Sequence, residues 1–313
     1  MTYFKHIFRK SNYFPKIFVI GINNVCNLSC PLCITGLKMQ QKKKEFMKFE
    51  LFTQIIHKLT GFRGLVQLYK WGESLLHKDL ITMLEFCNRY DLRTEISSNL
   101  SLHDIDDKLE AMVIFKLKHL IVSFDGVNQD DYSRYRIGGD FSLVLENLKK
   151  LANYKKKHRS AFPFISLQYL VSKYTSNQPD IIRQNYKKWG ADRYSLDEMT
   201  TLFKDRDNTR VAQWFTAEEI KRRKYLDVNY SMLGEKCPFL HNYMIVEQDG
   251  SIPPCCWSTD PRDDFFHWDN AMTLKQMYHT EKFNIARRMF NNEKTSASIV
   301  CNDCSIYLSY IQR

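Results

Sequence analysis

Three cysteines near the start of the chain lie close enough in sequence to share one metal site. Cys26, Cys30 and Cys33 follow the spacing C-x3-C-x2-C, and no fourth cysteine lies nearby in the sequence. Cysteine thiolates this close together in sequence typically bind zinc or an iron–sulfur cluster. A structural zinc site wants a fourth ligand close by, whereas three thiolates on a four-iron cluster leave one iron open. The triplet therefore predicts a metal centre with an open position, and a zinc site that borrows a distant cysteine is the alternative.

Segments with strand and helix patterns alternate from the start of the chain to about residue 200. Apolar runs predict strands at Lys16–Ile22, Leu65–Tyr69, Thr94–Ser97, His119–Phe124, Phe164–Val171 and Arg193–Leu196. Amphipathic patterns predict helices at Leu51–Leu59, Asp79–Tyr90, Ile105–Lys116, Phe141–Asn153 and Pro179–Trp189. Such alternation predicts an α/β fold with a parallel sheet covered by helices. Six units can form a partial (βα)6 barrel of the TIM type, whose catalytic loops follow the strands as the triplet does.

The pattern changes after residue 200, which predicts a division of the chain into three parts. We expect the partial barrel in residues 1–200, a helical connector in 201–236 and a small α+β domain in 237–313. The connector contains a polar helix pattern at Thr216–Tyr225. In the last part, Asp249 and Gly250 lie between short β-like runs and predict a hairpin.

Composition and charge narrow the class of protein. The chain has 313 residues, nine cysteines and a formal net charge of +11. No apolar run reaches the ~20 residues of a membrane helix, and no signal peptide is evident, so we expect a cytoplasmic protein. Nine cysteines in such a chain indicate metal binding. The charge fits an acidic substrate or an acidic electron carrier, and we expect no nucleic-acid partner because aromatic residues do not alternate with the basic runs.

The triplet after the first strand of an α/β chain resembles the radical S-adenosylmethionine superfamily, and this resemblance covers nearly the whole chain. It implies that Cys26, Cys30 and Cys33 hold a [4Fe-4S] cluster. The methionine amino and carboxylate groups of S-adenosylmethionine would then chelate the open iron. An electron from the cluster would cleave the sulfonium and give a 5'-deoxyadenosyl radical. In such enzymes the cofactor supplies the chemistry, while the protein positions it and excludes water.

The loops after the second, third and fourth strands carry further motifs that resemble the family. The run from Trp71 to Ser74 is similar to Gly-Gly-Glu-Pro, with Trp in place of the first glycine and Ser in place of proline. Ser98 and Asn99 resemble the Thr-Asn-Gly loop. The arginine before Gly138 matches a residue that binds the methionine carboxylate, a task that suits a planar guanidinium. The resemblance thus implies cofactor contacts for Trp71, Gly72, Glu73, Ser74, Ser98, Asn99, Ser123 and Arg136, with Arg134 as a surface residue.

Four cysteines near the end of the chain form a second set. The spacings C-x12-G-x4-C and C-x2-C resemble the SPASM/Twitch type of auxiliary-cluster domain. Because nine residues follow the last cysteine, we interpret the domain as the shortened Twitch form. The resemblance implies a second, auxiliary [4Fe-4S] cluster for electron relay or structure, and zinc is the alternative. Its ligands would be Cys237, Cys255, Cys301 and Cys304.

Three other residues are weaker candidates for a role in the site, and Cys87 is expected to have none. Cys87 lies in a predicted helix, where we expect it to be a buried apolar residue. Cys256 adjoins a predicted ligand and is either a hydrogen-atom donor or a packed neighbour. Asp197 and Glu198 follow the last strand and would bind substrate or act as a base. A helix cap is the alternative for this acidic pair.

The sequence therefore predicts a radical enzyme with one auxiliary cluster that abstracts a hydrogen from its substrate. The leading hypothesis is an oxidoreductase acting on a sugar-like or aminocyclitol-like small molecule. A maturase that epimerises or cross-links a ribosomally made peptide is the second, although the 25 residues before Cys26 are too few for a leader-binding domain. A non-catalytic redox or zinc-binding protein is the third. The expected electron donor is an acidic protein such as flavodoxin or ferredoxin.

Overall fold

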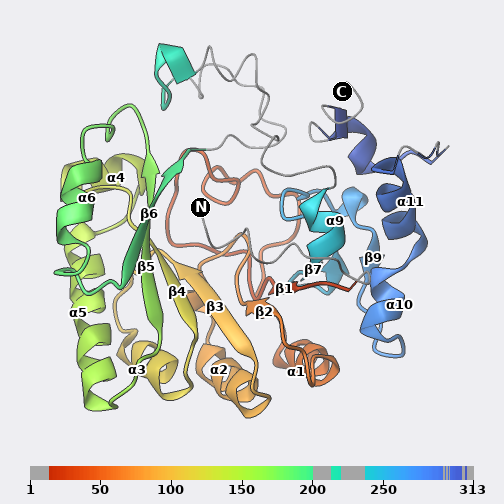
Figure 1. Ribbon diagram of the computed structural model, residues 1–313, viewed down its shortest axis with the longest axis horizontal. Helices are drawn as coiled ribbons and strands as arrows, with labels where there is room; N and C mark the ends of the chain where they lie inside the picture. Colours follow the sequence, from red (N-terminus) through yellow and green to blue (C-terminus); the bar gives the residue numbers. More distant parts are fainter. Residues whose placement is uncertain are drawn as a thin grey trace.

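The structure is a computed structural model dominated by one parallel sheet. It describes residues 14–199, 213–219, 237–291, 293, 295, 297–304 and 307–308. Seven strands pair in the order β6-β5-β4-β3-β2-β1-β7, and every pairing in this sheet is parallel. The strands fan out into an open, curved sheet (Figure 1). The predicted α/β partial barrel is confirmed.

Six of these strands occupy the segments predicted from the sequence. They are β1 (Ile17–Ile20), β2 (Leu65–Gln67), β3 (Arg93–Ser98), β4 (His119–Ser123), β5 (Phe164–Val171) and β6 (Arg193–Glu198). Five predicted helices are also found, as α1 (Phe49–Lys58), α2 (Leu80–Arg89), α3 (Asp106–Ile114), α5 (Phe141–Lys157) and α6 (Pro179–Asn185). The sequence does not predict a further helix, α4 (Gln129–Tyr135). Its buried side chains are two tyrosines, and Ser133 between them is partly buried, so the segment has no apolar stripe.

The outer side of the sheet is covered by helices α1, α2, α3, α5 and α6 (Figure 1). The loops that follow the strands lie together at the edge where the strands end (Figure 1). Alternate strand residues supply the packing against the helices. Phe18 and Ile20 of β1, for example, are fully buried in the same apolar cluster as Ile55 of α1. Burial of such side chains contributes roughly 1.5–3 kcal/mol each relative to exposure. Among the described residues, no helix is long and apolar enough to cross a membrane.

The predicted hairpin around Asp249 and Gly250 is corrected by the structure. The turn itself forms, with the Gly250 amide donating to the Glu247 carbonyl at 2.9 Å. However, the two strands join different sheets. Strand β7 (Tyr243–Val246) pairs with β1, whereas β8 (Ser251–Ile252) pairs antiparallel with β9 (Phe266–His267). The last part of the chain therefore contributes the edge strand of the barrel sheet.

Short helices surround this second sheet at the β7 end of the molecule (Figure 1). They are α9 (Pro238–Asn242), α10 (Leu274–Tyr278) and α11 (Glu281–Met289), with the 3₁₀ turns η4 (Pro261–Asp263) and η5 (Val300–Asp303). Buried Arg287 of α11 donates to the Leu240 carbonyl of α9 at 2.8 Å and to the Tyr278 carbonyl of α10. One side chain thus ties three helices together. The expected connector, residues 201–236, lies mostly outside the described residues.

Candidate metal and cofactor sites

The cysteine triplet lies on the loop that follows β1, as the sequence predicts. This loop is held in place by backbone contacts to a distant segment, because the Ser29 amide donates to the Ile137 carbonyl at 2.9 Å. Within the loop, the Cys33 amide donates to the Cys30 carbonyl, and the Leu28 amide donates to Cys26 Sγ at 3.4 Å. An amide directed at sulfur favours the charged thiolate, the form that binds metal.

The three thiols are close enough to influence one another electrostatically. Burial raises the pKa of Cys26 to about 12; the Leu28 amide opposes this rise, while Cys30 and Cys33 add to it. Burial also raises the pKa of Cys30, and the nearby Arg136 charge opposes that rise. Within the described ranges, no three Cys, His, Asp or Glu side chains are already arranged around a metal-ion position. The donor set of three thiols on one loop nevertheless fits a cluster, whose binding would deprotonate them.

The motif after β2 packs directly on the loop that carries the cysteines. Gly72 is required there, since a Cβ atom would lie 1.9 Å from Asn23 Oδ1 and 2.6 Å from the Asn23 carbonyl oxygen. The Asn23 side chain donates to the Glu73 carbonyl at 3.0 Å, and the Glu73 amide donates to the Val25 carbonyl at 2.8 Å. Trp71 accepts through its carbonyl from the Thr35 hydroxyl. The motif and the cysteine loop therefore form one unit.

Glu73 and Ser74 have structural partners in this unit. The Glu73 carboxylate is buried and accepts from the amides of Leu75 and Asn99, at 3.0 and 2.8 Å. Burial raises the pKa of Glu73, although these amides act in the opposite direction. Ser74, which replaces the family's proline, donates its hydroxyl to the Leu68 carbonyl at 2.7 Å. That bond stabilises the turn that proline would otherwise fix.

The loop after β3 brings Asn99 to the cysteine loop. The Asn99 side-chain amide donates to Asn27 Oδ1 at 2.9 Å and lies 4.0 Å from Cys26 Sγ. Ser98 accepts from the Leu100 amide at 3.0 Å and so shapes the turn. The structure therefore places both predicted polar residues beside the triplet, with Asn99 in direct contact.

Arg136, at the C-terminal end of α4, reaches the triplet from the connection after β4. Its guanidinium pairs with Asp125, which is 2% exposed and also accepts from the Leu170 amide at 2.7 Å. The remaining guanidinium nitrogen lies 3.6 Å from Cys30 Sγ. Ser123, at the end of β4, is buried two residues before Asp125. Exposed Arg134 stacks on the Tyr174 ring instead, as expected for a surface residue.

The C-terminal cysteines come from three separate segments and meet inside the last part of the chain. Cys237 precedes α9, Cys255 follows β8, Cys301 lies in the η5 turn and Cys304 directly follows it. Burial raises the pKa of Cys237 to about 12, and Cys255 and Cys304 add to the rise. Burial also raises the pKa of Cys301, and the other three thiols of the set add to this rise. Cys237 and Cys301 are buried, Cys255 and Cys304 are partly buried, and none of the nine cysteines is disulfide-bonded. Four neighbouring free thiols suit a fully ligated cluster or zinc.

The remaining candidates differ in position. Cys87 is buried in α2, which confirms the apolar interpretation. Cys256 packs with Ile17, Val19 and Ile245 on the side of β1 and β7 opposite the helices. Asp197 and Glu198 belong to β6 itself, paired with Leu170 and Val171, so the interpretation as a helix cap is wrong. The Asp197 carboxylate accepts hydrogen bonds from Gln168 of β5, at 3.0 Å, and from Ser195 of β6, at 3.1 Å.

Comparison with known proteins identifies the barrel. Residues 20–166 match the family described as the Radical SAM superfamily. These residues, which make up just under half of the chain, are thus similar to the Radical SAM superfamily. GTP 3',8-cyclase from Alkaliphilus oremlandii is 27% identical to this chain over 143 residues, which cover 45% of the chain and 43% of the cyclase. The chain thus spans less than half the length of this curated relative, and the alignment falls within one part of each protein.

Solved structures share the fold of this matched segment and of the region after it. The structure of BtrN in complex with AdoMet and 2-DOIA has a TM-score of 0.57 at 15% identity, and the match covers 94% of both chains. Streptococcus suis SuiB bound to its precursor peptide SuiA has a TM-score of 0.64 at 15% identity, over 94% of this chain and 70% of SuiB. At these identities the likeness establishes the fold.

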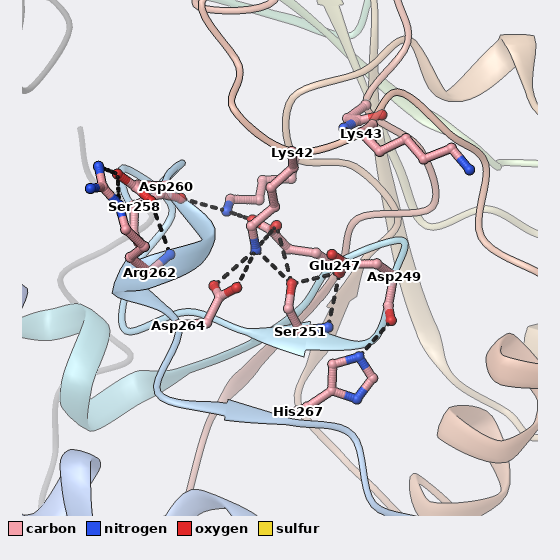
Figure 2. Close-up of polar contacts among 12 residues, drawn as sticks. Lys42, Lys43, Glu247, Asp249, Ser251, Ser258, Asp260, Arg262, Asp264 and His267 are labelled. Carbon is pink, nitrogen blue, oxygen red and sulfur yellow. Dashed lines mark hydrogen bonds and ion pairs between the residues drawn. The ribbon is translucent and has the colours of Figure 1, made fainter.

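A buried ionic cluster joins the barrel to the last part of the chain. Lys42, in the loop after the cysteine triplet, is inserted among Glu247, Ser251 and Asp264, at 2.5, 2.6 and 2.8 Å (Figure 2). Lys70, next to the motif after β2, also pairs with Glu247 and donates to the Ser258 carbonyl. Burial lowers the pKa of Lys70 to about 8, while the nearby Cys256 and Cys255 raise it.

Sequence reasoning missed the ionic cluster and Asp125. Lys42 belongs to a run of three lysines that reads as a solvated face, yet its side chain is 5% exposed, whereas that of Lys43 is 84% exposed. Asp125 was visible as a polar residue just after a strand. No local signal showed that it would pair with Arg136, since the two meet through the return of the chain after α4.

Proposed function

We propose that this protein is a radical S-adenosylmethionine enzyme with one auxiliary [4Fe-4S] cluster. When bound, the first cluster and S-adenosylmethionine supply a one-electron cleavage that yields a 5'-deoxyadenosyl radical. Cys26, Cys30 and Cys33 would hold this cluster, and Asn99 and Arg136 would orient the loop that carries them. The observation that carries the proposal is the convergence of these side chains inside the segment that is similar to the Radical SAM superfamily.

The residues around the triplet would bind the methionine part of S-adenosylmethionine. The backbone of Trp71, Gly72 and Glu73 lies against the cysteine loop, and Ser74 and Ser98 shape the turns beside it. Arg136 would exchange part of its contact with Asp125 for the methionine carboxylate, with Ser123 near the same strand end. Cys237, Cys255, Cys301 and Cys304 would hold the auxiliary cluster in a Twitch-type domain.

We further propose that the substrate is a hydroxylated small molecule and the reaction an oxidation. BtrN, whose structure holds AdoMet and 2-DOIA, matches this chain over 94% of both lengths, which supports a shared domain plan. Four thiol ligands would leave the auxiliary cluster without an open iron and fit it for accepting an electron. Asp197 and Glu198 at the end of β6 and Cys256 are the candidates for contact with the reacting substrate.

Maturation of a peptide is the second candidate function. SuiB, which is bound to its precursor peptide SuiA, has the higher TM-score of the two solved structures. A non-catalytic redox or zinc-binding protein is a third candidate of another class. The cytoplasmic location and an acidic electron donor such as flavodoxin or ferredoxin remain predictions from the sequence.

Anaerobic reconstitution followed by reduction tests the proposal. We expect about eight irons and about eight sulfides per chain, and 5'-deoxyadenosine after addition of S-adenosylmethionine and dithionite. A Cys301→Ala/Cys304→Ala variant should keep about four irons and still release 5'-deoxyadenosine, because the first cluster has its own ligands. If the purified and reconstituted protein contained zinc and no iron, the proposal of a radical enzyme would be refuted. A short precursor peptide encoded beside the gene, and converted by the protein, would favour the maturase.

A further inference from the structure

A small cavity lies where the loops after β1 and β2 meet the segment after β7. Its walls include Gln40 and Lys42 from the first loop, Lys70 and Trp71 from the second, and Glu247 and Gln248 from the third. The cavity volume is about 10 Å³, enough for one water molecule or one hydroxyl group. The cavity thus lies between the motif proposed to bind methionine and the segment that carries Cys255.

Three of the residues that line the cavity carry buried hydrogen-bonding atoms without a partner in the described part of the chain. The indole nitrogen of Trp71, the side-chain amide nitrogen of Gln248 and the side-chain oxygen of Gln40 are buried without a hydrogen-bond partner among the described residues. Gln248 as a whole is 6% exposed. Each unsatisfied buried group costs about 1–3 kcal/mol. Three such groups around one cavity indicate a ligand that completes them.

The chemistry of the walls restricts that ligand. Lys42 already pairs with the carboxylates of Glu247 and Asp264, and the neighbouring Asp249 carboxylate accepts from Ser251 (Figure 2). Lys70 also pairs with Glu247. An ionic ligand would therefore leave one charge unpaired and buried, at a cost of several kcal/mol. The unused atoms comprise two donors, from Trp71 and Gln248, and one acceptor, from Gln40. A hydroxyl group accepts from donors and also donates, so it can satisfy both kinds.

We propose that this cavity receives a hydroxyl group at one edge of an uncharged, polyhydroxylated substrate, with Trp71 and Gln248 as specificity-determining residues. The size of the cavity suits one hydroxyl, so the rest of the substrate extends out of it. This inference rests on the proposed function, because it describes the substrate of the same radical enzyme. It adds the recognition element that distinguishes a polyol from a peptide.

The test is binding to the reconstituted protein with S-adenosylmethionine present. The probes are myo-inositol and D-glucose as polyols, and N-acetyl-trialanine amide as a peptide, measured by isothermal titration calorimetry. Gln248→Leu and Trp71→Phe each remove one donor while keeping most of the side-chain volume. Loss of one hydrogen bond of about 1.4 kcal/mol predicts about tenfold weaker binding of the polyol. Gln41→Leu, at an exposed glutamine beside the cavity wall, is the matched control and should bind normally.

Thermal unfolding of the same variants without ligand separates recognition from structure. Because the two donors are unpaired, their removal should leave the melting temperature unchanged or raised. Lower melting temperatures with unchanged polyol binding would show a structural water site and overturn the proposal. Preferential binding of the peptide, or no saturable binding of either polyol, would also overturn it. Failure of the wild-type protein to release 5'-deoxyadenosine would instead refute the proposed function, which this binding assay does not measure.

Discussion

The two cysteine sets differ in how the chain assembles them. The first set lies between residues 26 and 33 on a single loop, whereas the second is drawn from segments between residues 237 and 304. The first loop is contacted by Asn99, just after β3, and by Arg136, at the end of α4. The second set exists as a group because the last part of the chain folds around it. The first site is thus local in sequence, and the second depends on tertiary packing.

This difference gives the buried ionic cluster a role in the second site. Lys42 and Lys70 belong to the barrel, while Glu247 and Asp264 belong to the part of the chain that contains the second cysteine set. Their contacts hold the turn between β7 and β8, which leads directly to Cys255. Damage to the ionic cluster should therefore affect the second set and spare the first.

Of the variants that distinguish the two cysteine sets, Glu247→Gln should show the largest effect. The change keeps the shape of the side chain but leaves Lys42 and Lys70 without their shared carboxylate. Removal of one partner from a buried ion pair lowers the free energy of unfolding by about 3–5 kcal/mol. Denaturant unfolding of the protein without clusters measures this loss. After reconstitution we expect iron to fall from about eight to about four per chain, with 5'-deoxyadenosine still formed.

Lys43→Met is the matched control for this variant. Lys43 lies next to Lys42, but its ammonium is exposed and 3.9 Å from Glu45, a contact that contributes about 0–1 kcal/mol. Its unfolding and iron content should equal those of the wild-type protein. Equal losses in both variants, or loss of the first cluster from Glu247→Gln, would contradict the separation of the two sites.

Gly72→Ala should have an intermediate effect and should act on the first site. The new methyl group would overlap Asn23, which pairs with Glu73 and borders the cysteine loop. Overpacking of this kind costs about 1–3 kcal/mol, and we expect weaker binding of S-adenosylmethionine with the second cluster retained. Equilibrium dialysis with labelled S-adenosylmethionine measures the change.

Gly21→Ala provides the comparison for this glycine. Its Cβ atom would make an ordinary contact, 3.4 Å from Lys70 Cβ. If Gly21→Ala weakened S-adenosylmethionine binding as much as Gly72→Ala, the close approach of Gly72 to Asn23 would not explain the motif.

The same contrast explains how much of the molecule could be predicted from the sequence. The barrel strands are short apolar runs followed by turn residues, so β1 through β6 and their helices follow from local periodicity. The first cysteine set and its loops are also local signals. Strand β7 was predicted to form a hairpin, because its pairing with β1 across more than two hundred residues leaves no trace in the pattern around Gly250.

Partners far apart in sequence account for the other differences. The sequence predicts that the Arg136 guanidinium is free to bind the methionine carboxylate, but in the structure it pairs with the carboxylate of Asp125. Glu198 extends β6 beyond the predicted end at Leu196 because Val171 of β5 continues the pairing. Lys42 looked solvated because its acidic partners lie in the last part of the chain. Electrostatic pairing of this kind depends on tertiary structure, which single-sequence patterns do not encode.

Cys87→Ala should give the smallest effect, and it sharpens the comparison by separating packing from ligation. Cys87 is buried in α2 within the main apolar cluster, and burial alone raises the pKa of its thiol. Loss of the sulfur atom should lower the free energy of unfolding by about 1 kcal/mol, while iron content, S-adenosylmethionine binding and 5'-deoxyadenosine formation stay at wild-type values. Denaturant unfolding and iron analysis of the reconstituted variant measure both. A loss of iron would mean that a cysteine outside the two sets supports a cluster, and the division of the cysteines by position would then fail.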